Sequence, residues 1–238
     1  MSIHLRRTHA KKTLIFTVLV LAASVNAAEP EPFSRLNTVE VKSVFPEFKI
    51  RVHYDPAVST VRNQPHVGKD SGIPIVDVLD TRIDRTSRDR FTITYTDGLS
   101  ADPGFLISPV GTDMIVGDIW GLELFVPGNG AVYVTGHTNN HYNQRKTFVL
   151  KNGKLVEIRQ PFYYVGLDSK AKQDITIFSD KSEKEPVASI PSGAQLTVLL
   201  NEGEHYLIKT PMGLVGWARF VDHGQGAELI EGLYYRGD

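Results

Sequence analysis

FVLKNGKLVE, residues 148–157, is the stretch of the chain that indicates the fold most clearly. Two β-prone runs flank Asn152-Gly153, and an Asn-Gly pair supplies the two residues with positive φ that a type I′ turn needs. Apolar and charged residues alternate loosely along both runs, which indicates that one face of the pair meets water. We therefore predict a β-hairpin with its turn at Asn152-Gly153.

Segments rich in β-branched and aromatic residues recur on both sides of this hairpin and predict further strands. They cover residues 48–54, 73–83, 91–96, 114–119, 122–126, 131–135, 146–151, 155–158 and 162–165. Pro127-Gly128-Asn129-Gly130 separates two of them and predicts a second hairpin. Beyond the N-terminal segment, no stretch long enough for a helix has a helical apolar period. These observations predict an all-β fold.

The composition is that of an ordinary globular chain. The protein has 238 residues, of which 41% are hydrophobic and 22% charged, and this excludes disordered, collagenous and polytopic membrane proteins. Lys and Arg number 26 against 27 Asp and Glu, so we predict no nucleic-acid partner. The chain has no cysteine, which excludes disulfides, thiol nucleophiles and Cys-ligated metals.

The first 27 residues have the three parts of a secretory signal peptide: a basic start, an apolar run over residues 14–23, and a small-residue end at Val25-Asn26-Ala27. We predict cleavage between Ala27 and Ala28. The apolar run is about half as long as the roughly twenty residues that a membrane-crossing helix needs, so no retained membrane anchor is expected. A cysteine-free exported chain suits the periplasm, which is the predicted location.

Changes in composition divide the chain that remains after cleavage. Residues 28–45 begin with two Glu-Pro pairs and predict an extended lead-in. Residues 46–170 predict a β-rich domain of unknown function, built as an antiparallel β sandwich or a barrel-like sheet. The composition becomes polar over residues 166–173, which predicts a domain boundary near residue 171.

Two aromatic-rich stretches indicate how the chain ends. Pro161 to Val165 and Gly232 to Tyr235 are apolar where a solvated linker or a free tail would be polar. We therefore predict that the C-terminal tail, residues 223–238, packs back on the protein near the domain junction.

Residues 173–222 carry a distinct pattern. It opens with the strand-like Ile175-Thr176-Ile177-Phe178, continues through a turn glycine, Gly193, before another β-prone run, and closes with Gly213-Leu214-Val215-Gly216-Trp217. Gly216 is predicted to let the Trp217 indole lie against a neighbouring backbone. The pattern resembles that of bacterial SH3-like domains. The resemblance implies a small SH3-like barrel of five strands that binds or positions something in the cell envelope, commonly wall peptides.

Aromatic side chains are the candidate ligand-binding residues of this second domain. We expect Phe178, Tyr206 and Trp217 to bind the ligand, with peptidoglycan or a periplasmic protein as the partner. No catalytic residue, metal or cofactor is predicted, so the protein is expected to be a non-enzymatic binding module. A purely structural role, in which the barrel only packs on the first domain, remains open.

The alternative is a periplasmic hydrolase or metal-dependent enzyme with its site in the first domain. His137 and His141 are the best metal-binding candidates, with Trp120 as a further site residue. In an extended strand these histidines lie about 13 Å apart, too far to share a zinc ion. They would converge only if Asn139-Asn140 turned the chain, which asparagine pairs favour.

Aspartate and arginine alternate between residues 77 and 90. The residues are Asp77, Asp80, Arg82, Asp84, Arg85, Arg88, Asp89 and Arg90. The spacing does not match an EF-hand calcium loop. The interleaved charges predict that these arginines and aspartates neutralise one another as exposed ion pairs.

Overall fold

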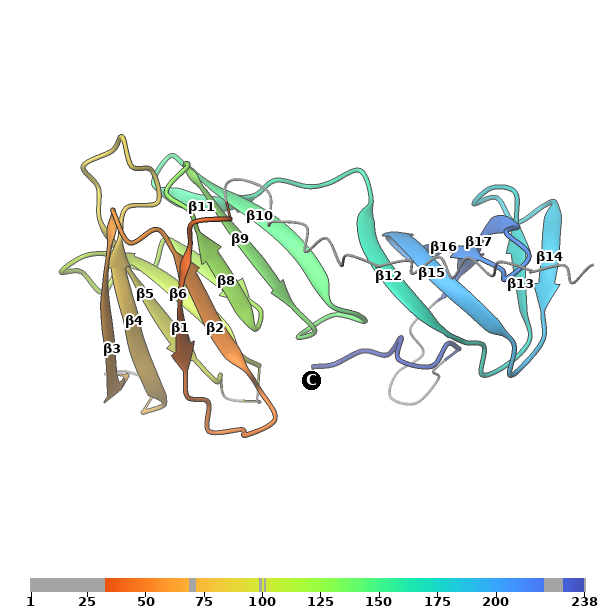
Figure 1. Ribbon diagram of the computed structural model, residues 1–238, viewed down its shortest axis with the longest axis horizontal. Coiled ribbons are helices and arrows are strands. Elements are labelled where there is room, and N and C mark those ends of the chain that lie inside the picture. The colour runs from red at the N-terminus through yellow and green to blue at the C-terminus, as the bar shows by residue number, and fades with distance from the viewer. Residues whose placement is uncertain (1–32, 69–71, 99, 101, 221–228, 238) are drawn as a thin grey trace, which may run out of the picture.

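The computed structural model describes residues 33–68, 72–98, 100, 102–220 and 229–237. The predicted signal peptide lies outside these residues. The described chain contains no helix and forms three sheets, which confirms the all-β fold. Accordingly, nothing in the described ranges is a helix of the length and hydropathy that would cross a membrane. The sheets form two bodies that lie side by side, with the C-terminus between them (Figure 1).

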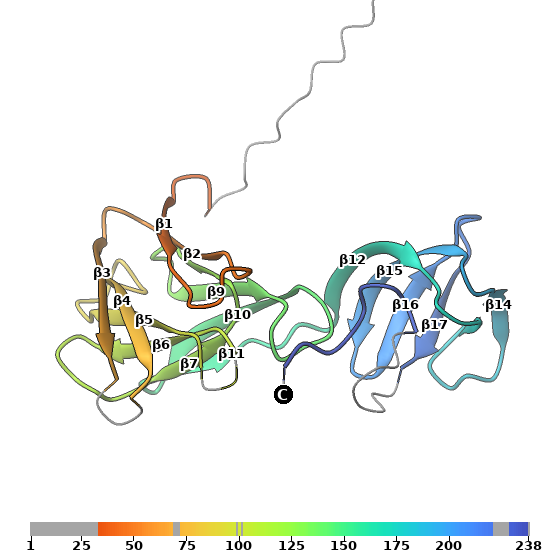
Figure 2. The same cartoon turned by 90° about the horizontal axis from the view of Figure 1, so that it is seen from below.

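The first body is a sandwich of two sheets (Figure 2). One sheet has the order β1 (Asn37–Val41), β2 (Ile50–Tyr54), β8 (Glu123–Val126), β9 (Ala131–Gly136), β10 (Gln144–Lys151), β11 (Lys154–Glu157). The other has the order β3 (Ser59–Val67), β4 (Pro74–Thr81), β5 (Phe91–Thr96), β6 (Gly104–Pro109), β7 (Gly117–Trp120). All neighbours are antiparallel except β2 and β8, which run parallel.

The core of the first body lies between these two sheets. Leu124 and Val132 of one sheet and Ile93, Phe105 and Ile107 of the other are fully buried in a single cluster. Burying each such side chain contributes about 1.5–3 kcal/mol, so the alternation of buried and exposed residues fixes which face of each strand turns inward. The predicted sandwich is therefore present in the first body.

Both predicted hairpins are confirmed. Asn152 and Gly153 have φ values of 50° and 74°, and Lys151 pairs with Lys154 across the turn between β10 and β11. β8 pairs with β9 in the same antiparallel way. These positive φ values are what a type I′ turn requires.

Three strands of the first body were not predicted. β1 lies inside the expected lead-in of residues 28–45, and β6 lies outside the segments predicted as strands because its apolar run is short. β3 is polar and exposed along almost its whole length because it is an edge strand. Pro65 is tolerated in β3 for the same reason, since an edge strand has backbone N–H groups that need no partner.

The second body is a single sheet that wraps around its own core. Its order is β12 (Tyr163–Lys170), β15 (Gln195–Glu202), β16 (His205–Lys209), β17 (Val215–Arg219), β13 (Ile175–Phe178), β14 (Pro186–Ile190). All neighbours are antiparallel. The sheet has six strands where five were expected, because β12 joins it at the edge.

The position of β12 corrects the predicted domain boundary. Because β12 pairs with β15, the chain passes from one body to the other between Glu157 and Tyr163, not near residue 171. The polar residues that suggested a linker are the solvent-facing positions of a strand. Asp168, for example, accepts a 2.7 Å hydrogen bond from the Thr197 hydroxyl on the neighbouring strand.

Gly216 allows β17 to lie close to β13. A Cβ at this position would lie 2.8 Å from the carbonyl oxygen of Phe178 and 3.0 Å from Cβ of Ile177. Glycine is therefore needed because of the backbone of β13, and not to accommodate the Trp217 indole as the sequence suggested. The close approach lets β13 return beside β17 and wrap the sheet around its core.

Two segments, the β9–β10 connection and residues 229–237, join the two bodies because each contacts both of them. Tyr142, in the β9–β10 connection of the first body, is buried in the core of the second, and its hydroxyl donates to Asn201 at 3.1 Å. The C-terminal segment, residues 229–237, contacts both bodies. Ile230 is fully buried in the core of the second body, and Arg236 forms a β-bridge with Asn140 of the first. The Arg236 guanidinium also lies 4.8 Å from the ring centroid of Phe48.

Candidate functional site

The structure brings together two of the three aromatic residues predicted to bind a ligand. Phe178 and Trp217 are direct partners on neighbouring strands, so their side chains share one face of the sheet. Neither belongs to the core cluster of the second body. Tyr206 is only 4% exposed and packs between Tyr142 and Phe220. Tyr206 therefore lies in the core, and its buried ring is not available to a ligand.

Strand register extends the Phe178–Trp217 pair into a row that crosses the sheet. Leu207 pairs with Trp217, Leu200 pairs with Leu207, and Tyr164 pairs with Leu200. We call Tyr164, Leu200, Leu207, Trp217 and Phe178 the aromatic row. None of its members contributes to the core cluster. The row lies on the outer face of the second body and occupies five neighbouring strands.

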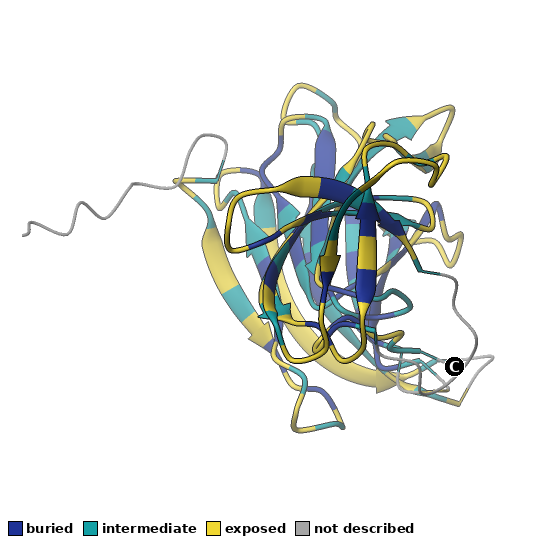
Figure 3. Ribbon diagram, turned by 90° about the vertical axis from the view of Figure 1, so that its right-hand side faces the viewer, coloured by how far each residue is buried: buried dark blue, intermediate teal, exposed yellow. Residues whose placement is uncertain are grey.

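The alternation along β16 shows why the row faces outward. Tyr206 and Ile208 are buried on the core side, and Leu207, which lies between them, is only partly buried. Figure 3, in which the second body faces the viewer, shows the same alternation of buried and less buried positions along its strands. The row is partly exposed, with Tyr164 the most exposed member, and it lies outside the core cluster.

Two β-bulges align the row. One, between Val198 and Leu200, brings Leu200 opposite Leu207; the other, between Tyr164 and Leu167, brings Tyr164 opposite Leu200. Gly166 in the second bulge has a φ of 64°, and a Cβ there would lie 2.5 Å from the Tyr164 ring. The ring therefore rests directly over Gly166. Tyr164 is 59% exposed at the end of the row.

Charged side chains border the row. The Lys181 ammonium lies 4.8 Å from the ring centroid of Trp217 and forms an ion pair with Glu202. Beside them, Arg219 binds the carboxylate of Glu204 at 2.6 Å. An apolar centre with a charged rim is the usual organisation of a binding surface. A lysine over the indole face also contributes a modest cation–π attraction.

The histidines of the alternative metal site contact the C-terminal segment. Asn139 has a φ of 51°, so the chain does turn between them as the asparagine pair suggested. His137 Nε2 donates to the carbonyl oxygen of Tyr234 at 2.9 Å, and the His141 ring packs edge-on against Tyr235. Among the residues described, no group of three or more His, Cys, Asp or Glu side chains could hold a metal ion.

Trp120, the further residue of the alternative site, packs against its own sheet. It lies on β7, and a Cβ added to Gly104 on the neighbouring strand would lie 3.0 Å from the Trp120 ring. The ring therefore packs over Gly104.

Burial in the junction lowers the pKa of His137, and the nearby positive charge of Arg236 acts in the same direction.

A buried carboxylate at the end of β5 has a structural role. Asp97 accepts hydrogen bonds from the Tyr95 hydroxyl at 2.6 Å, from the Ser43 hydroxyl, and from the Val44 N–H at 3.1 Å. Burial and the neighbouring Asp97 raise the pKa of Tyr95, so its hydroxyl remains a donor. These bonds attach the β1–β2 connection to the end of β5.

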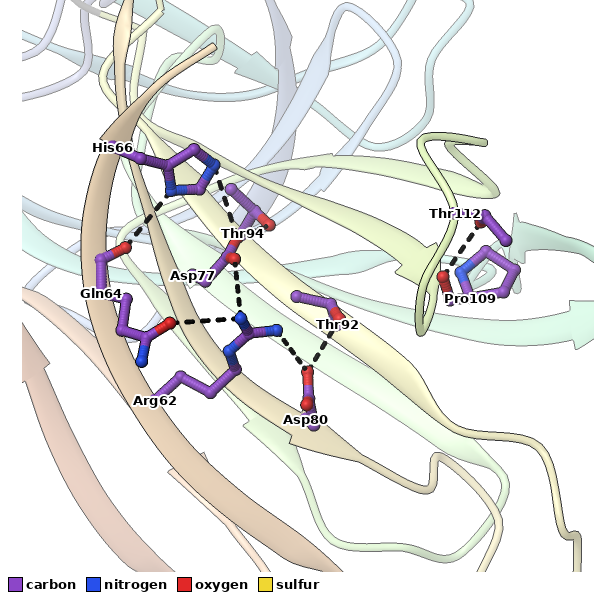
Figure 4. A network of polar contacts seen from close by, with 9 residues as sticks. All are labelled: Arg62, Gln64, His66, Asp77, Asp80, Thr92, Thr94, Pro109 and Thr112. Atoms are coloured by element: carbon purple, nitrogen blue, oxygen red, sulfur yellow. Dashed lines mark hydrogen bonds and ion pairs between the residues drawn. The ribbon is translucent and has the colours of Figure 1, made fainter. Parts of the chain in front are cut away.

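The aspartates of the alternating acidic and basic segment have partners on other strands. Arg62 of β3 lies 3.7 Å from Asp77 and 3.5 Å from Asp80, which are both on β4 (Figure 4). The hydroxyls of Thr94 and Thr92 on β5 donate to the same two carboxylates. We call this outer surface of β3, β4 and β5 the polar face.

The predicted ion pairs within residues 77–90 are therefore wrong. Arg85 does form one, but with Asp55 from outside the segment, at 2.9 Å. The pairing of β3 with β4 places Arg62 beside the aspartates. Among the described residues, Arg82, Arg88 and Arg90 take no part in these ion pairs.

Comparison with known proteins finds no matching family model, no matching curated protein and no matching solved structure. The candidate site therefore depends on the geometry of the second body.

Proposed function

We propose that the protein is an exported, non-enzymatic component of the bacterial cell envelope that acts in the periplasm. Its second body is an SH3-like binding module, and the aromatic row is the surface that holds peptidoglycan. The signal peptide that the sequence predicts provides the export. The observation that carries the proposal is the row itself, an apolar line across five strands that the core does not use.

The composition of the row suits an extended ligand. Aromatic side chains offer a large contact area with little loss of conformational freedom, because each has only two rotatable χ angles. Leu200 and Leu207 make the surface continuous between Tyr164 and the Phe178–Trp217 pair. A ligand lying across the strands would therefore contact several members at once.

The charged rim suits a polymer that has both carboxylates and amines. The rim has two cations, Lys181 and Arg219, each in an ion pair with a carboxylate of Glu202 or Glu204, so a ligand with charges of both signs can exchange with these partners. Wall peptides have groups of both signs, so the rim can orient the ligand while the row supplies affinity.

Co-sedimentation with purified peptidoglycan tests the proposal. We expect the mature chain to sediment with the polymer, and Trp217→Ala to weaken retention about tenfold because it removes the largest side chain of the row. Met212→Ala is the matched control, since Met212 is an exposed apolar residue of the same body that lies in the β16–β17 turn, away from the row. Its retention should be that of the unmodified protein.

Two outcomes would overturn the proposal. One is retention of the unmodified chain no greater than that of a control protein of similar charge at moderate salt. The other is equal retention of the Trp217→Ala and unmodified proteins, with circular dichroism showing that both are folded.

A further inference from the structure

Three arginines converge on a groove of the first body, on the connections that flank β3, β4 and β5. The groove has a volume of about 380 Å³ and is lined by Ala57, Val58, Ser59, Thr60, Arg82, Arg88 and Arg90. Its size is at the lower end of the range for small-ligand pockets. We call it the arginine groove.

The three guanidinium groups have no carboxylate partner among the residues that the structure describes. Within the described ranges, none of Arg82, Arg88 and Arg90 forms a side-chain hydrogen bond or an ion pair with another residue. Other arginines of the same body behave differently: Arg51 binds Glu123, and Arg62 binds Asp77 and Asp80. Three like charges in one groove repel one another unless an anion lies between them.

The aspartates nearest to these arginines in the sequence are used locally. Asp84 accepts from the N–H and the hydroxyl of Thr86, at 2.8 and 2.7 Å, and these bonds lower the pKa of its carboxyl group. Asp89 accepts from the Ser87 hydroxyl at 2.9 Å. These bonds shape the β4–β5 connection, and neither carboxylate forms an ion pair with Arg82, Arg88 or Arg90 in the described part of the chain.

The backbone around the groove is held by hydrogen bonds. The Arg82 N–H donates to the Val58 carbonyl at 3.2 Å, and the Arg90 carbonyl accepts from the Val110 N–H at 3.0 Å. The hydroxyls of Ser59 and Thr81 lie 2.7 Å apart. The arginines therefore extend from a fixed frame, which reduces the entropy lost when a ligand binds.

From this arrangement we infer that the arginine groove binds a phosphoryl group, either of a phosphorylated small molecule or of a lipid headgroup. A phosphate monoester carries about −1.5 to −2 charges on three acceptor oxygens. Three guanidinium groups, with five N–H donors each, match that charge and number of acceptors better than they match the two oxygens of one carboxylate. This site is independent of the aromatic row on the other body.

Calorimetric titration of the mature chain with inorganic pyrophosphate at low ionic strength tests the inference. We expect saturable binding that weakens as salt is added. Replacing Arg88 and Arg90 together by Ala should weaken binding at least about tenfold, since each removes charge-assisted hydrogen bonds. The matched control replaces Lys151 and Lys154, two exposed lysines of the same body, by Ala, and should leave binding unchanged.

Vesicles distinguish the two sources of the phosphoryl group. Sedimentation with phosphatidylglycerol vesicles but not with phosphatidylcholine vesicles, lost in the arginine variant, assigns the groove to a lipid headgroup. Pyrophosphate binding without vesicle binding assigns it to a soluble ligand. The inference is overturned if neither probe binds, or if the lysine variant loses as much affinity as the arginine variant while both remain folded.

Discussion

The polar face of the first body and the outer face of the second body carry different kinds of side chain. On the polar face, Arg62 binds Asp77 and Asp80, and hydroxyls of β5 donate to the same carboxylates. On the second body, Leu207 and Trp217 occupy the corresponding solvent-facing positions of neighbouring strands. The polar side chains of the first surface bond to one another, whereas the second surface has partly exposed apolar side chains that lie outside the core cluster.

The comparison teaches that strand alternation alone does not identify a binding surface. Both faces belong to antiparallel sheets whose inner residues are buried. Scattered exposed apolar residues are normal in soluble proteins, but a contiguous set across several strands marks an interaction site. What differs is whether neighbouring outer side chains bond to one another.

The largest effect is expected from two neighbouring residues of β16 that face opposite sides. Ile208→Ala should lower the free energy of unfolding by about 2–5 kcal/mol, because Ile208 is fully buried and its truncation leaves a cavity. Leu207→Ala, in the aromatic row, should cost less than about 1 kcal/mol. Urea unfolding of both variants measures the difference. Equal losses would show that the row is part of the core.

An intermediate effect is expected at the junction between the two bodies. The pKa of His137 is lowered by burial, so neutral His137 is favoured while residues 229–237 are packed against it. Above the ordinary histidine pKa of about 6.5, the packing of the C-terminal segment against His137 does not depend on pH. Below it, a released His137 takes up a proton more readily than the packed one, so the packing weakens as pH falls below about 6.5. His141 and Arg236 add repulsion to the protonated form, whereas the Tyr234 and Asn140 backbone bonds oppose it.

Hydrogen exchange measures this weakening. The N–H groups of Asn139 and Arg236, which bond across the junction, should exchange faster at the lower pH after correction for the intrinsic rate. His137→Gln keeps a donor for Tyr234 but does not titrate. If this variant shows the same acid-dependent exchange, another group is responsible.

The smallest effect is expected on the polar face. Arg62→Ala should cost less than about 1 kcal/mol, because its ion pairs with Asp77 and Asp80 are partly exposed and screened by solvent. Thermal unfolding at low and high salt measures the loss and its screening. A loss as large as that of Ile208→Ala would mean that the polar face stabilises the sheet as a core does.

Much of the fold follows from local signals in the sequence. Asn152-Gly153 identifies a hairpin because few residue pairs adopt two positive φ values. The β-branched and aromatic runs identify most strands for a similar reason, since their alternation reflects burial on one side. β3 lacks this signal because it is exposed at an edge. The second half of β12 lacks it because Asp168 and other polar residues face water, so only the start of β12 is predicted, within residues 162–165.

The candidate sites depend on contacts between distant segments. The sequence singles out Phe178 and Trp217, but the inclusion of Leu200 and Tyr164 depends on two bulges that shift strand register. It also pairs charges that are neighbours in the chain, whereas the structure gives the aspartates to Arg62 from another strand. Neither relation is visible without knowing which strands lie side by side.

The contacts at the junction mean that the core of the second body is incomplete without a residue of the first. Tyr142 completes the second core from a loop of the first, and residues 229–237 return from the second body to Asn140. Residues 229–237 thus hold together segments that lie far apart in the sequence. A chain cut at residue 228 would keep β1 to β17 but lose the contacts of Ile230 and Arg236, so separating the two bodies would remove more than a linker.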